Sequence, residues 1–464
     1  MSGQTPAALF AAQTAQVAAR RTSFGLAERR AALQRMAAMV RDNQPAIIAA
    51  LAKDFGKPEA EVVLTEILPV MQEIRHTLRH LRRWMRVRRV MPSLTTLGTS
   101  ARVVPQARGV CLIIAPWNYP FNLCFGPLVS CLAAGNSAVL KPSEMTPATS
   151  ALIARLVAET FPADLVAVVQ GGREEAQALL ALPFDHVFFT GSPAVGREVM
   201  AAAARHLSSV TLELGGKSPV IIGPGADVTQ AAKWVAFGKF ANAGQTCIAP
   251  DHVFVHEAVR APFLAALRDR IAAAYGAGAD SSHLARIVND RHAGRLRGLL
   301  EDAVAKGARV LTGGPGQGTR LPPILVEAVT PEMGLMQEEI FGPVLPILPF
   351  TVLEPVLDRI NAGPKPLALY VFDRDAGFAD RVLSATTSGG AGVNLTVMHY
   401  AHPGLPFGGV GNSGLGAAHG EAGFRAFSHD RAVLTNRFSA LPLLFPPYAG
   451  RAKRLIALVR RFLT

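Results

Sequence analysis

Cys247 is the first residue whose chemistry needs an explanation, because it lies among small and polar residues in ANAGQTCIAP, residues 241–250. A thiol there can act as a nucleophile if a base or a lowered pKa activates it and if donors meet the oxyanion that it creates. The neighbouring sequence offers neither a CxxC pair nor a histidine. A lone cysteine is more often a core residue. If Cys247 reacts, groups distant in the sequence must activate it.

Glu213 is a second candidate, since it stands among apolar residues before two glycines in TLELGGKSP. A carboxylate at the end of a buried strand is costly unless it is used or paired. As a functional group, Glu213 would be a general base with a raised pKa that activates water. The alternative is a salt bridge with Lys217, and on these residues alone the salt bridge is the better-supported interpretation.

Asn118 follows an apolar strand in APWNYPFN, where two prolines fix a turn. Its side-chain amide could donate to an oxyanion. The alternative is an asparagine that only forms the turn, which is common and, taken alone, the better interpretation.

Two further segments could bind a phosphate or a sugar. FTGSPAVGREV connects a strand to a helix, and although Gly191 and Gly196 do not form a GxGxxG fingerprint, a glycine turn before a helix N-terminus favours a phosphate. LKPSE places Lys141 and Glu144 at the carboxyl edge of a sheet, where open α/β sheets bind ligands. An ordinary turn and a solvated ion pair are the alternatives.

The segments that position these residues alternate between helical and strand-like patterns. Up to about Arg89, apolar residues recur at three and four positions, which predicts helices, whereas residues 91–109 predict an extended hairpin. From Gly109, buried strands alternate with helices as in a doubly wound parallel sheet. A second series of this kind begins after Gly215 and Gly216, where we place a domain junction. The predicted class is α/β.

Charge is unevenly distributed over the 464 residues, whose formal net charge is +13. Seven arginines between Arg75 and Arg89 have a solvated basic face as their default explanation. No acidic residue follows Asp430, and the end of the chain, GRAKRLIALVRRFLT, alternates basic and apolar clusters. This tail is typical of an amphipathic helix that binds an anionic membrane or a partner protein. Nucleic acid is not expected, because no binding module accompanies the charge.

The cysteines and the N-terminus indicate the compartment. The spacing of the four cysteines fits no zinc motif, so no metal site is expected, and a secreted disulfide scaffold would be far shorter. The first residues lack the charged and apolar regions of a signal peptide. We therefore expect a cytoplasmic protein, peripheral at the inner membrane surface if its tail binds lipid.

Taken together, the motifs resemble the ordered motif set of the aldehyde dehydrogenase superfamily. They occur in the same order from about residue 100 to 430, and the set is far more specific than any single motif in it. The motifs are APWNYPFN, LKPSE, FTGS, ELGGKSP, NAGQTC, EEIFGPVLP and PFGGVGNSG. The short N-terminal region, NAGQTCIAPDHV and the segment from LPFGG to AFSH are most similar to the class 3 branch, which includes fatty, aromatic and coniferyl aldehyde dehydrogenases.

The resemblance implies a role for each candidate. Cys247 matches the nucleophile that forms a thiohemiacetal and then a thioester, Asn118 and the Cys247 backbone N–H match the oxyanion hole, and Glu213 matches the base that activates water. A base at this position favours hydrolysis to the free acid over transfer to phosphate or coenzyme A. The expected cofactor is NAD or NADP, with a lean towards NAD because Glu144 would crowd a 2′-phosphate. The matched cofactor contacts are Lys141, Glu144, Gly191, Ser192, Gly196, Glu339 and Phe341.

The resemblance also implies an organisation and partners. Residues 1–90 and 104–214 would form the NAD(P)-binding domain and 215–395 the catalytic domain. A small β element for bridging and oligomerisation would comprise residues 91–103 and 396–435, followed by the basic tail, 436–464. The expected partners are a hydrophobic aliphatic or aromatic aldehyde and a second copy of the chain in a homodimer. Two other functions stay open: a thiol esterase or acyl hydrolase with the same site, and a basic membrane-associated scaffold.

Overall fold

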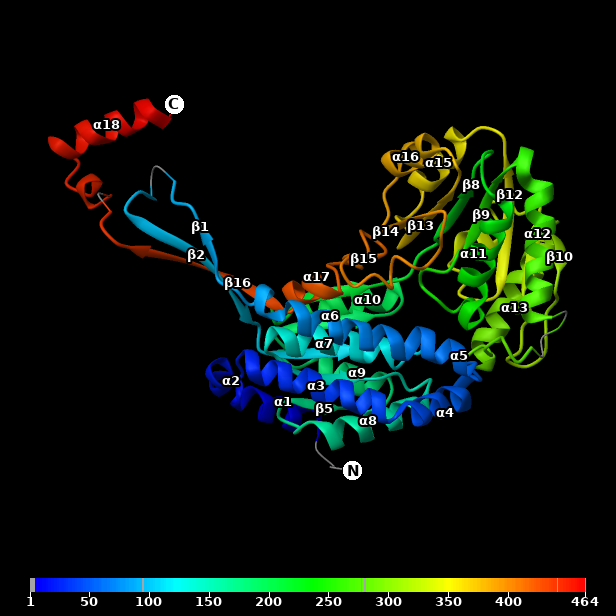
Figure 1. Ribbon diagram of the computed structural model, residues 1–464, viewed down its shortest axis with the longest axis horizontal. Helices are drawn as coiled ribbons and strands as arrows, with labels where there is room; N and C mark the ends of the chain where they lie inside the picture. Colours follow the sequence, from blue (N-terminus) through cyan, green and yellow to red (C-terminus); the bar gives the residue numbers. More distant parts are fainter. Residues whose placement is uncertain (1–4, 94–95, 277, 279–280, 440, 464) are drawn as a thin grey trace.

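Three β-sheets organise the chain in this computed structural model, which describes residues 5–93, 96–276, 278, 281–439 and 441–463 (Figure 1). Two are large, mostly parallel sheets with helices on their faces, and the third is a three-stranded antiparallel arm. The predicted α/β class with two parallel sheets and a small β element is therefore confirmed.

The first large sheet has five parallel strands and one antiparallel edge strand. Its spatial order is β15 (Gly414–Leu415), β7 (Ser209–Glu213), β6 (His186–Thr190), β3 (Val110–Ile114), β4 (Ser137–Lys141) and β5 (Val166–Val168). Strands β3, β4 and β6 are buried along their whole length, because helices cover both faces. The connecting helices are α7 (Asn122–Ala134), α8 (Pro147–Thr160), α9 (Arg173–Leu180) and α10 (Pro193–Ala204).

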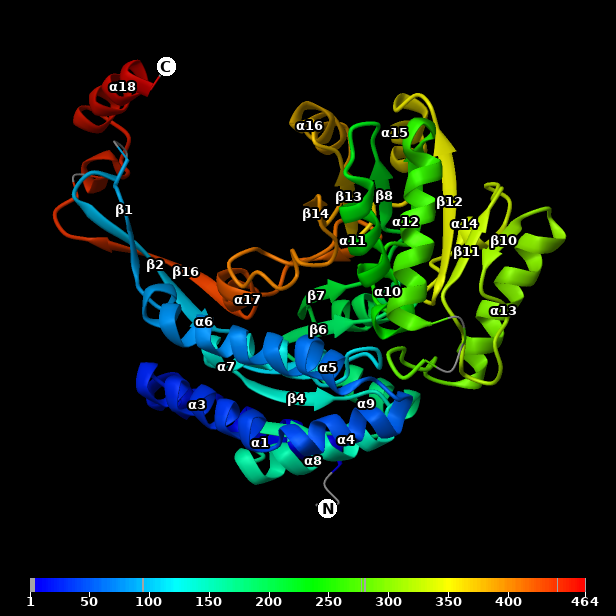
Figure 2. The same cartoon turned by 45° about the vertical axis from the view of Figure 1, so that its right-hand side comes forward.

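The N-terminal helices pack onto this first sheet domain. They are α1 (Pro6–Ala15), α2 (Val17–Ser23), α3 (Leu26–Asp42), α4 (Gln44–Phe55), α5 (Glu59–Val62) and α6 (Leu68–Trp84), with a π-helical turn η1 (Val63–Ile67) before α6. Helices α3 and α6 contact α7, and α4 contacts α8 (Figure 2). The helical prediction is confirmed as far as Trp84. The predicted helix end at about Arg89 is wrong, because Arg88 to Val90 form strand β1.

The second large sheet holds the stretch that contains Cys247. Its order is β10 (Arg309–Thr312), β11 (Ile324–Glu327), β12 (Val344–Phe350), β9 (His252–His256), β8 (Pro219–Ile222), β13 (Ala368–Phe372) and β14 (Gly390–Val393), and only β10 is antiparallel to its neighbour. Its helices are α11 (Val228–Phe240), α12 (Glu257–Tyr275), α13 (Asp290–Ala305), α14 (Gly334–Gln337), α15 (Glu354–Ala362) and α16 (Ala376–Ala385).

The arm joins two segments that are distant in sequence. Strand β2 (Thr99–Ala107) pairs with β1 (Arg88–Val90) on one side and with β16 (Ser428–Asn436) on the other, and α17 (Gly420–Ala426) leads into it. The β element was predicted to comprise residues 91–103 and 396–435, but its strands begin before residue 91 and end after residue 435. Strand β15, which belongs to the predicted segment 396–435, lies in the first large sheet instead.

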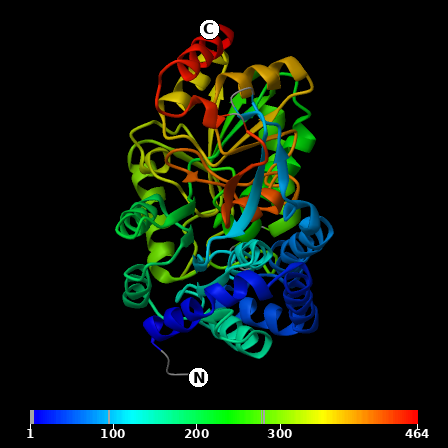
Figure 3. The ribbon, with the colours of Figure 1, turned by 90° about the vertical axis from the view of Figure 1, so that its left-hand side faces the viewer.

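The basic tail forms a 3-10 turn η4 (Leu441–Leu444) and the helix α18 (Arg451–Leu463), which lies beyond the tip of the arm. Helices α1 and α18 lie at opposite ends of the molecule (Figure 3). No helix within the described residues is long and apolar enough to cross a membrane.

Candidate active site

Cys247 lies in an irregular turn after α11. The chain passes through three consecutive left-handed residues, Asn242, Ala243 and Gly244, with φ of 52°, 53° and 73°. A Cβ on Gly244 would lie 2.3 Å from the carbonyl oxygen of Gly342, so only glycine fits there. Such conformations persist where the surrounding structure holds them in place, and they concentrate at functional sites.

Two cavities meet at Cys247. One has a volume of about 490 Å³ and is lined by Cys247 and Glu213 together with Asn118, Glu339 and Phe341. The other has a volume of about 190 Å³, and it also reaches Cys247 and Glu213. Its remaining lining is mainly apolar and includes Leu64, Leu123, Phe237, Ile248, Val397, Met398 and Phe407. Cys247 and Glu213 thus line both cavities.

The Cys247 thiol is not activated by its own surroundings. Burial raises the pKa of Cys247 above its ordinary value, and the nearby carboxyl groups of Glu339 and Glu213 raise it further. The backbone N–H groups of Cys247 and Ile248 act in the opposite direction, but their effect is smaller. An ionised thiol therefore requires a proton acceptor or a positive charge that enters with a bound molecule.

Glu213 ends strand β7 and is paired in register with Gly414. Its side chain is buried, and among the described residues its Oε1 has no hydrogen-bond partner. Burial raises the pKa of Glu213 from 4.5 to about 8. An unpartnered buried carboxyl group beside a cavity is costly to the fold, and such groups concentrate at functional sites.

The alternative salt bridge between Glu213 and Lys217 is wrong. The Lys217 ammonium binds the carboxylate of Asp251 at 2.5 Å and the carbonyl oxygens of Leu335 and Glu338 at 2.8 Å each. These three acceptors satisfy its three donors. Beyond the two glycines the chain turns into the second sheet domain, which directs Lys217 away from Glu213.

Asn118 lies beside Cys247 through a contact that spans the sequence. Its Nδ2 donates to the carbonyl oxygen of Gln245 at 3.0 Å, and the side chain lines the larger cavity. The purely turn-forming alternative is not observed, because the amide holds Gln245 rather than its own turn. An amide Nδ2 has two donors, so a second N–H is left for an oxygen bound near Cys247.

The predicted cofactor contacts fall into two groups. Gly191, Ser192, Glu339 and Phe341 line the larger cavity, and Ser192 caps the N-terminus of α10, which favours a phosphate. Lys141 and Glu144 form an ion pair of 3.0 Å at the carboxyl end of β4, outside this lining.

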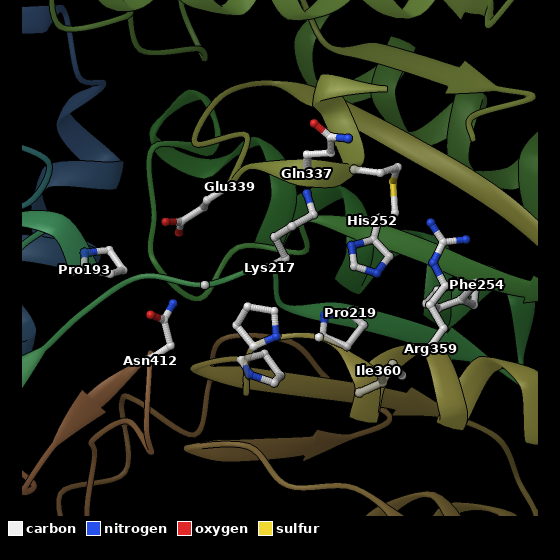
Figure 4. A pocket seen from close by; sticks show the side chains of 15 residues that line it. Pro193, Lys217, Pro219, His252, Phe254, Gln337, Glu339, Arg359, Ile360 and Asn412 are labelled. Atoms are coloured by element: carbon white, nitrogen blue, oxygen red, sulfur yellow. The ribbon is translucent and has the colours of Figure 1, made fainter. Parts of the chain in front are cut away.

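Gly196 does not face the cavity. It is buried in α10, where a Cβ would lie 2.7 Å from Cδ2 of Leu214, so its role in this structure is close packing of α10 against the chain after β7. Glu339 is half-buried, and desolvation raises its pKa to about 8. A further pocket of about 300 Å³ lies on its other side, lined by Lys217, His252 and Arg359 among others (Figure 4).

A set of residues that contact the Asn118 loop was not predicted from the sequence. They are Lys57 and Glu66 from the N-terminal helical region, Tyr119, and Gln245 and Asn242 before the nucleophile. The signal was present, since Lys57 and Glu66 stand among apolar residues in FGKPEAEVVLTEI, where an unpaired charge would be costly. Nothing in this segment indicates which partner each charged residue meets.

The chain matches known proteins over nearly its whole length. The Aldehyde dehydrogenase family matches residues 2–433. A probable coniferyl aldehyde dehydrogenase from Pseudomonas aeruginosa is 44% identical over 89% of this chain and 87% of its own. Aldehyde dehydrogenase family 3 member A2 from Macaca fascicularis is 40% identical over 89% of this chain and 86% of its own.

A solved structure is similar in fold as well as in sequence. The substrate-bound state of the Staphylococcus aureus enzyme AldH superposes with a TM-score of 0.91 at 39% identity, covering 97% of this chain and 98% of that one. The motif order, the two parallel sheets and these matches lead to one conclusion. The chain is a member of the aldehyde dehydrogenase family, and its relatives agree with the predicted class 3 branch.

Proposed function

We propose that this enzyme oxidises a hydrophobic aliphatic or aromatic aldehyde to the carboxylic acid with NAD or NADP. The observation that carries the proposal is the position of Cys247 and Glu213 at the junction of two cavities. An aldehyde can approach the thiol from the apolar side, and a cofactor from the side that carries the N-terminus of α10.

Cys247 would begin the reaction by forming a bond between its Sγ and the aldehyde carbon. The carbonyl oxygen then gains negative charge, which the free N–H of Asn118 and the backbone N–H of Cys247 would stabilise. Glu213 would accept the thiol proton, because burial raises its pKa to about 8 and so makes its carboxylate a stronger base.

The residues around the larger cavity fit a nicotinamide dinucleotide. Ser192 at the N-terminus of α10 would hold phosphate, Glu339 would contact the nicotinamide ribose, and Phe341 would lie beside the nicotinamide ring. When bound there, the cofactor would supply a hydride acceptor next to Cys247. Outside this cavity, the Lys141–Glu144 pair would contact the adenosine ribose. The lean towards NAD rests on Glu144, whose carboxylate would repel a 2′-phosphate.

Glu213 would complete the reaction by activating water. The acyl group is then attached to Cys247 as a thioester, and a carboxylate with a free oxygen beside the sulfur can take a proton from an attacking water. This role explains why Glu213 lies unpaired next to a cavity. A thiol esterase would need the same two residues, but it would have no use for the cofactor side.

The apolar cavity supports the substrate class. Its lining of leucine, isoleucine, valine, methionine and phenylalanine side chains favours a hydrophobic chain or ring over a charged one. The name of the Pseudomonas aeruginosa relative, a probable coniferyl aldehyde dehydrogenase, agrees with an aromatic substrate.

The test is a panel of aliphatic and aromatic aldehydes, assayed with NAD and with NADP by absorbance of the reduced nicotinamide. We expect Cys247→Ala and Cys247→Ser to fold and to lose this activity. An unaltered rate in either variant would refute the assignment of the nucleophile, and hydrolysis without added cofactor would favour the esterase.

We also propose that the chain works as a cytoplasmic homodimer through the arm, with residues 1–90 and 104–214 binding the cofactor and 215–395 carrying the chemistry.

The basic tail, residues 436–464, is proposed to contact anionic membranes peripherally. Helix α18 carries five cations, and Phe445, Tyr448 and Leu458 around it are more than half exposed. Sedimentation with anionic vesicles, with and without residues 441–464, tests this, and equal binding by both forms would exclude the tail.

A further inference from the structure

Lys57 is a buried cation directly behind the candidate oxyanion site. It follows α4 and is 1% exposed. Its Nζ donates to Oε1 of Glu66 at 2.7 Å and to the backbone carbonyl oxygen of Asn118 at 3.2 Å. The ring of Tyr119 lies over the ammonium at 4.1 Å. The cation therefore contacts both residues of the Asn118–Tyr119 peptide.

Glu66 fixes the other side of the same loop. Its Oε2 accepts from the backbone N–H groups of Phe121 and Asn122, at 3.2 and 2.9 Å. Glu66 belongs to the π-helical turn η1, and its neighbours Leu64 and Thr65 line the apolar cavity. π-Helical turns are rare and often found at functional sites. This one directs two side chains to the substrate side and one carboxylate to the loop of Asn118.

The loop of Cys247 is tied to the same place. Asn242 donates from Nδ2 to the Asn118 carbonyl at 2.9 Å, and its backbone N–H donates to Glu61 at 2.6 Å. The Tyr119 hydroxyl lies 2.6 Å from Oγ1 of Thr246, the residue before the nucleophile. The Asn118 carbonyl thus receives one donor from Lys57 and one from the turn that carries Cys247.

Stability alone does not explain a pair of this kind. Desolvating two charges costs several kcal/mol per ion, and replacing a buried ion pair by apolar residues is often neutral or stabilising. The pair instead holds the Asn118 loop in position, because Lys57 binds the Asn118 carbonyl and Glu66 binds the N–H groups of Phe121 and Asn122.

We propose that Lys57 and Glu66 are positioning residues that hold the Asn118 side chain where it meets the oxyanion. The inference rests on the proposed role of Asn118 in aldehyde oxidation. It specifies the step affected: formation and oxidation of the thiohemiacetal, in which the oxyanion develops. Reactions of Cys247 that create no oxyanion would not need the pair.

The test uses the neutralised pair variant, Lys57→Met with Glu66→Gln, which leaves no unpaired buried charge. The variant is made in the wild-type and Asn118→Ala backgrounds of the full-length enzyme. The rate of reduced nicotinamide formed in the first turnover is measured with the best aldehyde of the panel. We expect the neutralised pair to slow this rate about ten- to hundredfold, as small misplacements of catalytic groups do. In the Asn118→Ala background it should add no further loss.

Two further readouts separate positioning from a general structural effect. Alkylation of Cys247 by iodoacetamide forms no oxyanion, so its rate should be the same as in the wild type. Glu73→Gln is the matched control, since Glu73 is a buried glutamate on α6 that accepts from the backbone N–H of Gly420, away from Asn118. Its first-turnover rate should be unchanged.

The outcomes distinguish this inference from the proposed function. A first-turnover rate unchanged by the neutralised pair, or reduced by the same factor in both backgrounds, would overturn the positioning role alone. A parallel loss of alkylation rate would do the same. An unchanged rate in Asn118→Ala itself would overturn the proposed oxyanion role, and this inference with it. If the neutralised pair fails to fold, the isosteric Glu66→Gln takes its place in the same comparison.

Discussion

Two buried glutamates near Asn118 and Cys247 differ in the hydrogen-bond partners that the fold gives them. Glu66 accepts hydrogen bonds from Lys57 and from the backbone N–H groups of Phe121 and Asn122. Glu213, at the end of β7, has an Oε1 without a partner among the described residues. Both are removed from water, but only one is compensated.

This difference in hydrogen bonding indicates different roles for Glu66 and Glu213. A carboxylate whose oxygens are satisfied holds its neighbours in place and cannot easily exchange a proton. A carboxyl group held by burial alone has a raised pKa and a free oxygen, which suits it to take a proton from water or from a thiol. This contrast supports the two proposed roles: Glu66 holds the Asn118 loop in position, and Glu213 transfers protons.

The first prediction concerns the turnover of a Glu213 variant. In Glu213→Gln, steady-state turnover should fall about 10²- to 10⁴-fold, the usual contribution of a general base, while cofactor binding stays as in the wild type. Steady-state assays and fluorescence titration with NAD provide the measurements. Turnover equal to that of the wild type would remove Glu213 from the chemistry.

The second prediction concerns the free energy of unfolding of a Glu66 variant. Glu66→Ala leaves the Lys57 ammonium buried and unpaired, so the free energy of unfolding should fall by about 3–5 kcal/mol. Glu213→Gln should cost little near neutral pH, because the carboxyl group that it replaces is already protonated there. Urea unfolding of both variants gives the comparison, and equal losses would show that the two sites are not different in kind.

A smaller effect is the pH dependence of acyl-enzyme hydrolysis. With a pKa of about 8, Glu213 gains the base form as pH rises, so the rate should increase up to about pH 8 and then level off. Pre-steady-state assays over this range measure it. In Glu213→Gln the same profile should be flat, and a rise that survives the substitution would point to another base.

A further effect concerns the dependence of stability on pH. The pKa of Glu213 is raised from 4.5 to about 8 in the fold, so between these values the folded state holds a proton that the unfolded state has released. The free energy of unfolding should therefore fall as pH rises through this window. Glu213→Gln lacks this loss, so the variant should equal or exceed the wild type in stability above pH 8. A variant less stable at high pH would contradict the raised pKa.

The sequence was sufficient for the fold and for the group around Cys247. Alternating strands and helices predicted the two parallel sheets, and the ordered motifs pointed to Asn118, Glu213 and Cys247 together. What it could not supply was the partner of each charge. Lys217 is only four residues from Glu213, yet it binds Asp251, because the chain changes domain between the two.

The positioning region was missed for a related reason. Glu66 reaches the loop of Asn118 because the π-helical turn η1 contacts α7, and Lys57 reaches it from the loop after α4. Neither contact has a local signature in the sequence. Gly196 packs against Leu214 in the structure, and its predicted contact with the cofactor stays a prediction.

The most direct test of the central claim is the intact mass of Glu213→Gln after mixing with aldehyde and NAD. If Glu213 is left unpaired in order to hydrolyse the thioester, the variant should form reduced nicotinamide only until one equivalent per active site has accumulated. It should then carry one acyl group, located on Cys247 by peptide mapping. Rapid multiple turnovers with no acyl group on Cys247 would contradict the account.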